Sequence, residues 1–309
     1  MAFVPQHLAM MSAINNDSLS ELLIALAALQ CMRLFRFTHI SNRQLVLLGI
    51  TLGLGLLTKA TFYYTAIPIA VITLILYSRR YALRITHYAL VFVPALLIGS
   101  VLWIRNLSVY GGLDVMGLAR HNAVVVGQPA TAQWLIDYGV GGLLQRFLVT
   151  TYRSFWGQFG WMAVPLPDRD YVFLGLLSVI ALIGWVWWMI ARGKGQEAMN
   201  DPQPRPYSGL LLTLLFLLTV GGYLYYNVTF VQHQGRYLFP ALIPIGLGCA
   251  IGWWQVLEKI KQLAARFTSG RWALWLNLMQ LIAFALIFSA LAAFDLIALQ
   301  RYIIPNLSA

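Results

Sequence analysis

Apolar residues fill eight stretches of this chain, and polar or turn-forming residues separate each stretch from the next. A membrane-spanning helix needs about 20 mostly apolar residues. Backbone groups inside lipid must pair with one another, and these runs are too uniformly apolar for the alternating strands of a barrel. The pattern therefore predicts an all-α polytopic transmembrane helix bundle. Its eight expected spans are residues 20–37, 44–58, 61–78, 88–104, 171–191, 209–229, 238–256 and 273–297.

The composition agrees with a membrane protein and excludes other classes. Of the 309 residues, 60% are hydrophobic and only 10% are charged. A soluble domain carries about 45–50% apolar and about 25% charged residues, so this chain lacks the polar groups to cover a water-facing surface. Two cysteines and few charges also exclude a disulfide-stapled secreted domain and a disordered chain. Cys31 and Cys249 lie inside apolar runs, where we expect them to be small packing residues.

The distribution of charge predicts an orientation. If the loop after the first full span is cytoplasmic, 13 basic and 3 acidic residues face inward, against 8 basic and 7 acidic residues outward. Cytoplasmic loops of membrane proteins carry an excess of Lys and Arg, so this arrangement is the favoured one. The net charge of +11 is then a topology signal that needs no nucleic-acid partner. The inner basic clusters are expected to meet anionic membrane lipids.

The segments outside the spans suggest an organisation into modules. Residues 1–14 are apolar but short for a span, and we expect an outer half-span there. In the long outer loop, residues 143–162 are amphipathic and aromatic, which predicts a helix lying in the outer interface. The inner loop 192–208 is the predicted boundary between two helix bundles. The predicted modules are a transmembrane module at 1–104, an outer loop at 105–170 and a C-terminal transmembrane module at 171–309.

Four polar groups lie at the predicted outer ends of the spans, where polar residues are informative in such an apolar chain. They are Asn15-Asn16-Asp17-Ser18, Thr58-Lys59, Trp103-Ile104-Arg105-Asn106 with the downstream Asp114 and His121, and Gln232-His233-Gln234-Gly235-Arg236-Tyr237. Each has a structural alternative. Asp17 or Ser18 suits a helix N-cap, Lys59 a lysine snorkelling to the interface, and Arg105 a helix C-terminus or a lipid phosphate.

If these groups converge, they form a site suited to a lipid-linked phosphate. Lys59, Arg105 and Arg236 supply cations at lipid depth, and positioned cations stabilise the negative charge that develops when a sugar leaves a phosphate. A nearby carboxylate would deprotonate an acceptor hydroxyl or hold a divalent cation. The candidate metal-binding residues are Asp17, Asp114 and His121.

These segments resemble the polytopic glycosyltransferases of the GT-C superfamily, including bacterial relatives of protein mannosyltransferases and of the lipid A aminoarabinose transferase. Among bacterial members, the resemblance is greatest to membrane proteins of unassigned function. The segments that carry it are Pro5-Gln6-His7 through Asn15-Asn16-Asp17-Ser18-Leu19, Leu57-Thr58-Lys59-Ala60-Thr61, Trp103-Ile104-Arg105-Asn106 with Tyr110-Gly111, Phe155-Trp156-Gly157-Gln158-Phe159-Gly160-Trp161, and Gln234-Gly235-Arg236-Tyr237-Leu238-Phe239-Pro240-Ala241.

The resemblance implies transfer of a sugar from a polyprenyl-phosphate donor to an acceptor at the extracytoplasmic face of a bacterial inner membrane. Asp17 would match the catalytic acidic residue of an outer turn. Lys59, Arg236 and, more weakly, Arg105 would hold the donor phosphate. The substrate-binding residues would be Asn16, His121, Gln234 and Tyr237.

One departure from the family is the absence of a first helix and of the outer loop that bears its catalytic acid. The expectation is that Met1 is an internal start and that two further spans are encoded upstream. The chain would then be a truncated enzyme that is inactive as it stands. Translating the DNA upstream of Met1 tests this expectation, because an in-frame stop codon close upstream would contradict it.

Two alternatives from other classes stay open. A lipid or solute transporter or flippase would also have kinked spans and polar groups within the membrane. Transporters place ionisable residues near the midplane, whereas the middles of these spans are nearly free of charge. The other alternative is a non-catalytic subunit of a membrane complex.

Overall fold

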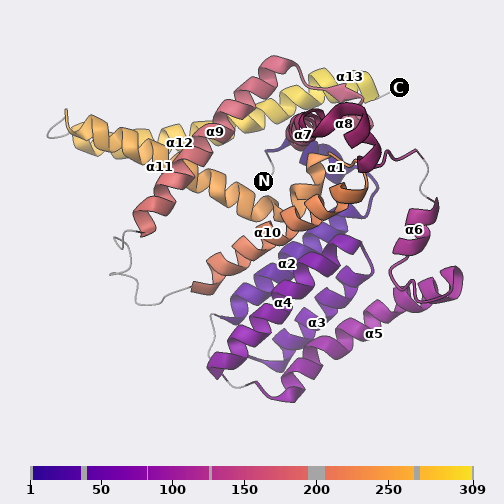
Figure 1. The fold of residues 1–309 in the computed structure, drawn as a ribbon. Helices are drawn as coiled ribbons and strands as arrows, with labels where there is room; N and C mark the ends of the chain where they lie inside the picture. Colours follow the sequence, from indigo (N-terminus) through magenta and orange to yellow (C-terminus); the bar gives the residue numbers. More distant parts are fainter. Residues whose placement is uncertain are drawn as a thin grey trace.

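The computed structural model describes residues 3–35, 40–81, 83–124, 127–193, 206–267 and 272–307, and nearly all of them are helical. The prediction of an all-α membrane helix bundle is confirmed (Figure 1). The elements are α1 (Pro5–Ser12), α2 (Asp17–Leu34), α3 (Asn42–Leu56), α4 (Ala60–Tyr81), α5 (Ile85–Tyr110), α6 (Leu118–Val124), α7 (Thr131–Trp156), α8 (Phe159–Met162), β1 (Val164–Pro165), α9 (Asp168–Gly193), α10 (Pro206–Thr229), η1 (Gly235–Ala241), α11 (Leu242–Ala265), α12 (Trp272–Ala298), η2 (Leu299–Ile303) and α13 (Ile304–Leu307).

All eight expected spans fall on helices, and six of these helices are long and apolar enough to cross a membrane. The other two are α2 and α3. Helix α2 has 18 residues and carries Asp17, Glu21 and Arg33, while α3 has only 15 residues. Both pack among the longer helices of the first bundle.

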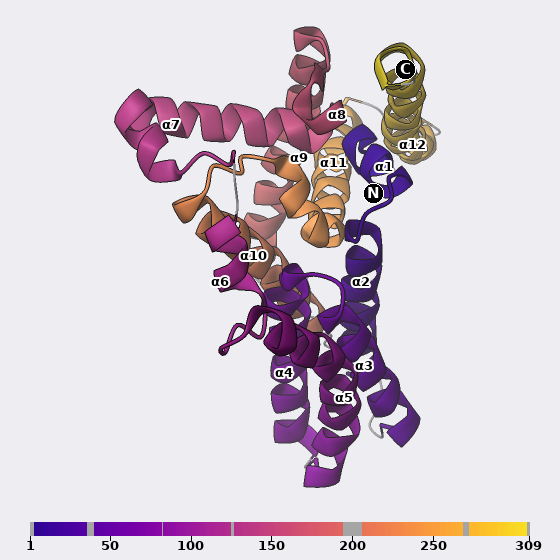
Figure 2. The ribbon, with the colours of Figure 1, turned by 90° about the vertical axis from the view of Figure 1, so that its right-hand side faces the viewer.

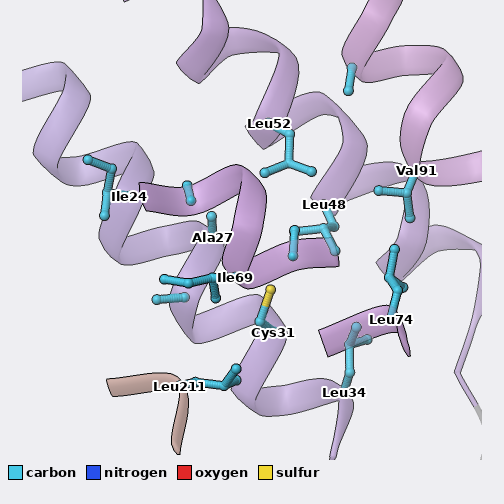
Figure 3. Close-up of a cluster of buried hydrophobic side chains, with 14 of the residues drawn as sticks. Ile24, Ala27, Cys31, Leu34, Leu48, Leu52, Ile69, Leu74, Val91 and Leu211 are labelled. Atoms are coloured by element: carbon cyan, nitrogen blue, oxygen red, sulfur yellow. The ribbon is translucent and has the colours of Figure 1, made fainter. Parts of the chain in front are cut away.

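The first hydrophobic core joins α2, α3, α4, α5 and α10. Figure 3 shows its centre, where Ile24, Cys31, Leu48 and Ile69 point toward one another and Leu211 enters from α10. Cys31 is a free, fully buried cysteine, as expected of a packing residue. Helix α10 therefore packs on the helices α2–α5 that precede it in the chain, although the sequence predicted a boundary between two bundles at 192–208, most of which lies outside the described residues.

A second core joins α1, the end of α7, α9, η1, α11 and α12. Its tightest contact lies between α9 and α11, where a Cβ added at Gly184 would overlap the carbonyl of Gly252. Small residues let membrane helices approach this closely and pack by van der Waals contact. Gly252 in turn lies against the backbone of Ala181. The two bundles meet where α1 and η1 contact α2.

Charged side chains separate along the first bundle. Asp17 begins α2 and pairs with Lys59, which precedes α4, so both lie at one end of the bundle. Arg33 lies in the last turn of α2, and Arg79 and Arg80 lie in the last turn of α4, at the opposite end. The charge pattern of the sequence assigned these arginines and the Asp17–Lys59 pair to opposite sides, and the structure places them at opposite ends of the bundle.

The predicted interfacial helix at 143–162 corresponds to the second part of α7, which ends at Trp156, and to the short helix α8 (Phe159–Met162). Gly139, with φ 65° and ψ 175°, is not helical and separates this part of α7 from the part that begins at Thr131. Figure 2 shows α7 lying crosswise to the helices α2–α5, and α7 contacts α1, α9, α10 and η1. Much of its surface is exposed and apolar, including Leu135, Ile136 and Leu144. Its position in a membrane interface stays a prediction.

Candidate functional site

Two turns at the same end of the first bundle are joined by parallel contacts. Asn16 Nδ2 donates a hydrogen bond to the carbonyl of Thr58 at 2.9 Å. The residues that follow Asn16 and Thr58 are also in contact, since Lys59 Nζ forms an ion pair with the carboxylate of Asp17. The segment before α2 and the segment before α4 are thereby held together, with both ionic side chains largely shielded from solvent.

The Asp17 carboxylate is available for this ion pair because another residue caps α2. Asn15 Oδ1 accepts the backbone N–H of Asp17 at 2.8 Å and that of Ser18 at 3.4 Å. The first turn of a helix has N–H groups without helical partners, and a side-chain oxygen commonly satisfies them. The cap that the sequence suggested for Asp17 or Ser18 is thus supplied by Asn15.

Arg236 is positioned by a close contact between η1 and α7. The backbone N–H of Gly235 donates to Ser154 Oγ at 2.7 Å. A Cβ at position 235 would overlap the carbonyl oxygen of Thr151 and the backbone nitrogen of Phe155, so only glycine fits between the two elements. This contact fixes where the next residue, Arg236, leaves the backbone.

The Arg236 guanidinium lies among aromatic rings and sulfur, with no carboxylate partner in the described part of the chain. Its Cζ lies 4.8 Å from the ring centroid of Trp161 and 5.3 Å from that of Tyr237. Nη1 contacts the sulfur of Met10 at 3.8 Å, and the buried Nε makes no hydrogen bond to a described residue. Lys59 Nζ lies 5.5 Å from the same Tyr237 ring. Two cations therefore share one aromatic ring, and only the lysine has a carboxylate partner.

These side chains face a cavity of about 770 Å³. Its polar part includes Asn16, Asp17, Lys59, Gln234 and Arg236. Its apolar part comes mostly from α1 and from the α12–α13 region. The apolar lining includes Pro5, Leu8, Ile14, Leu296, Leu299, Ile303 and Leu307. A cavity with a cationic part and an apolar part suits an anionic group carried on a hydrocarbon chain.

Helix α1 is fastened to the rest of the site by two polar contacts. The buried Gln6 accepts the backbone N–H of Gln158 through Oε1 at 2.7 Å. His7 Nε2 lies 3.0 Å from Glu21 Oε2 of α2. Of the Pro5-Gln6-His7 segment singled out in the sequence, Pro5 and Gln6 line the cavity, and His7 joins α1 to α2.

The backbone beside Arg236 adopts a rare conformation. Trp161 and Met162 have φ values of 54° and 75°, and they are the only non-glycine residues with positive φ in the described chain. Such left-handed residues cost of order 1–3 kcal/mol each and cluster at functional sites. The Trp161 side chain is 83% exposed while its ring contacts Arg236, so the strained turn presents an indole at the mouth of the cavity.

Arg105, Asp114 and His121 are satisfied elsewhere. Arg105 Nη1 donates to Asn106 Oδ1 at 3.0 Å and to Tyr110 Oη at 2.9 Å. The Asp114 carboxylate accepts the N–H groups of Ala119 and Arg120 at 3.2 and 2.8 Å. These hydrogen bonds stabilise the ionised carboxylate and hold the pKa of Asp114 below its usual range, and the bond from the Arg120 N–H has the largest effect. His121 contacts its neighbour Asn122 and the ring of Phe230.

The three residues considered for a metal site are therefore not brought together. Asp17 pairs with Lys59, Asp114 caps α6 and His121 lies on an exposed face of α6. Among residues with described placement, no group of three or more His, Cys, Asp and Glu side chains is arranged to hold a metal ion. Arg105 and His121 are also absent from the described lining of the 770 Å³ cavity.

The cavity lining includes residues that the sequence analysis did not name as site residues, among them Gln158, Trp161 and Asp295. Asp295 carried a usable signal, since it is an acidic residue in the segment of highest mean hydropathy, Trp275–Leu307. Ionisable residues inside such segments are expensive to place and usually functional. Gln158 and Trp161 lie in a segment that the sequence assigned to interface anchoring, and only the fold places them beside Arg236.

Comparison with known proteins supports the membrane assignment. The model of the family described as "Predicted membrane protein (DUF2142)" matches residues 1–245. The matched part includes α1 through η1, and with them the cavity cations Lys59 and Arg236. No curated protein matches the chain, and no solved structure matches it.

Proposed function

This chain belongs to the family of predicted membrane proteins DUF2142, and we propose that it transfers a sugar from a polyprenyl-phosphate donor to an acceptor at the extracytoplasmic face of a bacterial inner membrane. The observation that carries the proposal is that Arg236, which has no carboxylate partner among the described residues, lies beside the Lys59–Asp17 pair in a cavity with a large apolar lining. A polyprenyl phosphate has the matching parts, which are an anionic head and a long hydrocarbon chain.

In this proposal the donor phosphate lies beside Arg236 and Lys59, near the ring of Tyr237. Arginine forms paired, charge-assisted hydrogen bonds with phosphate oxygens, and its unpartnered Nε–H is a donor for such a bond. As the bond between the sugar and the phosphate breaks, negative charge grows on the phosphate oxygens. Fixed cations in a site of low water content stabilise that charge more than they stabilise the bound donor, and this lowers the barrier.

The remaining cavity side chains have supporting roles. Asp17 holds the Lys59 ammonium in place, and Asn16 holds the turn that carries it. Gln234 and Trp161 line the polar part and the mouth of the cavity, where a sugar ring would lie. Aromatic rings and amides are suited to the apolar faces and hydroxyl groups of sugars.

The experiment measures binding of a polyprenyl phosphate to the purified full chain in nanodiscs, followed by release of labelled hexose from polyprenyl-phosphate-linked hexoses. Lys59→Met is expected to weaken binding roughly tenfold or more, because a charge-assisted contact is lost. Lys261→Met is the matched control, since Lys261 also pairs with a carboxylate, that of Glu258, but lies outside the described lining of the cavity. Equal binding by both variants would contradict the proposal. Binding without release would favour a non-catalytic subunit, and net movement of the lipid across vesicles would favour a flippase.

A further inference from the structure

Asp295 is the only acidic residue in the apolar segment Trp275–Leu307, and it faces the cavity of the proposed donor site. Its Oδ1 is buried and has no hydrogen-bond partner among the residues that the structure describes. A buried polar atom without a partner costs about 1–3 kcal/mol, and more for a charged group. An acidic side chain with an unpartnered oxygen in a long apolar helix does not improve packing, and ionisable residues at such positions usually have a function.

The cavity therefore holds two incompletely satisfied groups of opposite charge, Arg236 with its unpartnered Nε and Asp295 with its unpartnered Oδ1. They form no ion pair with one another within the described structure. Both side chains line the same 770 Å³ cavity, which has room for a ligand that contacts both of them. That ligand would present an anion to Arg236 and a hydrogen-bond donor to Asp295.

Asp17 is less suited than Asp295 to accept a proton in this cavity. Its carboxylate is already engaged in an ion pair with the Lys59 ammonium, so it is not free to accept a proton from a bound ligand. None of the ion pairs between described residues includes Asp295. The two carboxylates of the cavity thus differ in their surroundings, as expected of groups with different roles.

We infer that Asp295 is the catalytic base that takes the proton from the acceptor hydroxyl during sugar transfer. This inference rests on the proposed function. The acceptor oxygen forms a bond to the anomeric carbon while the bond from that carbon to the phosphate oxygen breaks. The electron pair of the broken bond stays on the phosphate, next to Arg236. The acceptor proton passes to Asp295 and is later lost to water, so no further reactant is needed.

The position of Asp295 gives the last helix a defined role. The family match ends at residue 245, so Asp295 comes from the following part of the chain, whereas Lys59 and Arg236 lie within the match. Helix α12 contacts α1, and its end continues through η2 and α13 along the apolar wall of the cavity. The inferred base and the donor-phosphate cations are therefore contributed by different segments, which meet only in the folded chain.

Azide separates the inferred role from the proposed function, because it attacks as an anion and needs no proton acceptor. In Asp295→Ala, release of labelled hexose from a polyprenyl-phosphate hexose to water or hydroxyl acceptors is expected to fall by about 100-fold or more. Added azide should restore turnover and yield the glycosyl azide. Binding of polyprenyl phosphate should change by less than about twofold.

The control carboxylate is Asp137, which is exposed on α7 and accepts a hydrogen bond from Gln133. Asp137→Ala should leave release of hexose unchanged with and without azide. The inference is overturned if Asp295→Ala keeps release within about threefold of the original chain, or if azide fails to restore turnover in a variant that still binds polyprenyl phosphate. The proposed function fails separately, if Arg236→Gln binds polyprenyl phosphate as tightly as the original chain does.

Discussion

Two groups of polar residues each combine arginine and aspartate with another basic residue type, but their side chains make different kinds of contact. The cavity group consists of Asp17, Lys59, Arg236 and Asp295, and the loop group consists of Arg105, Asp114 and His121. In the loop group, the side-chain hydrogen bonds to described residues all lie within six residues along the chain. In the cavity group, Asp17 and Lys59 are 42 residues apart, and Arg236 reaches Met10 across 226 residues.

The difference shows what each group does for the protein. Arg105 and Asp114 satisfy their donors and acceptors locally and so build the helix end and the turn in which they lie. Arg236 and Asp295 are brought together by the fold and still keep unpartnered polar atoms. In such an apolar chain, a polar residue with a complete local set of partners is explained by structure. A polar residue that the fold places in a cavity, and that keeps a polar atom without a hydrogen-bond partner, is explained by a ligand.

Replacing an arginine in each group gives the largest expected contrast. Arg236→Gln should weaken binding of polyprenyl phosphate roughly 10- to 100-fold, because a charge-assisted contact to a phosphate is worth about 1.5–3 kcal/mol. Arg105→Gln should change binding by less than about twofold. Isothermal titration in nanodiscs measures both. Comparable losses in the two variants would erase the distinction between the groups.

The contact that places Arg236 gives the next largest effect. Gly235→Ala inserts a methyl group against the backbone of Thr151 and Phe155, and overpacking of this kind costs typically 1–3 kcal/mol. We expect a lower thermal midpoint and weaker phosphate binding, because the start of η1 must move. Gly221→Ala in α10 is the control, since a Cβ there meets open space and alanine favours a helix. Binding and unfolding are measured by titration and by tryptophan fluorescence during heating. Unchanged binding in Gly235→Ala would show that Arg236 does not depend on this contact.

The two groups also differ in how far the sequence could predict them. The helices follow from apolar runs, and the charge pattern correctly placed Arg33, Arg79 and Arg80 at the bundle end opposite Asp17 and Lys59. The sequence shows that Arg105 follows one predicted span and that Arg236 precedes another. It does not show which of the two side chains lines a cavity. That outcome depends on the Gly235–Ser154 contact across 81 residues, which no local pattern encodes.

The same limit explains Asp295 and Asn15. Asp295 could have been noticed as an acidic residue in an apolar segment, but its place beside the donor site depends on how α12 packs near α1. Asn15 and Asp17 are both good caps by residue type, and in the structure Asn15 accepts the first free N–H groups of α2 while the Asp17 carboxylate pairs with Lys59. Both outcomes depend on packing between segments that are far apart in the chain, and the local pattern of a single sequence does not show which segments pack together.

A pair of histidines provides a smaller, pH-dependent contrast. His233 is buried against Trp134 and Phe147, and burial lowers its pKa because the charged form is poorly solvated there. A lowered pKa in the folded state means that the stability from neutral His233 is present above its ordinary pKa of about 6.5 and is lost as pH falls below it. The thermal midpoint should therefore drop by a few degrees between pH 7.5 and pH 5.5. His233→Asn should show a flatter profile, and His121→Asn, whose ring is exposed, should keep the drop. A profile that is unchanged in His233→Asn would assign the drop to other groups.

Asp114 provides the smallest expected effect and the sharpest test of the loop group. Its pKa is lowered by the N–H groups that it accepts, so the α6 cap is present above the ordinary aspartate pKa of about 3.9 and is lost as pH falls through the lowered value. Asp114→Ala should reduce the exchange protection of the Ala119 and Arg120 amides at neutral pH, as measured by hydrogen–deuterium exchange. Phosphate binding and hexose release should stay unchanged, because Asp114 lies outside the described lining of the 770 Å³ cavity. If Asp114→Ala removed transfer while leaving these amides protected, the carboxylate would act on substrate, and local satisfaction would no longer distinguish structural from functional residues in this chain.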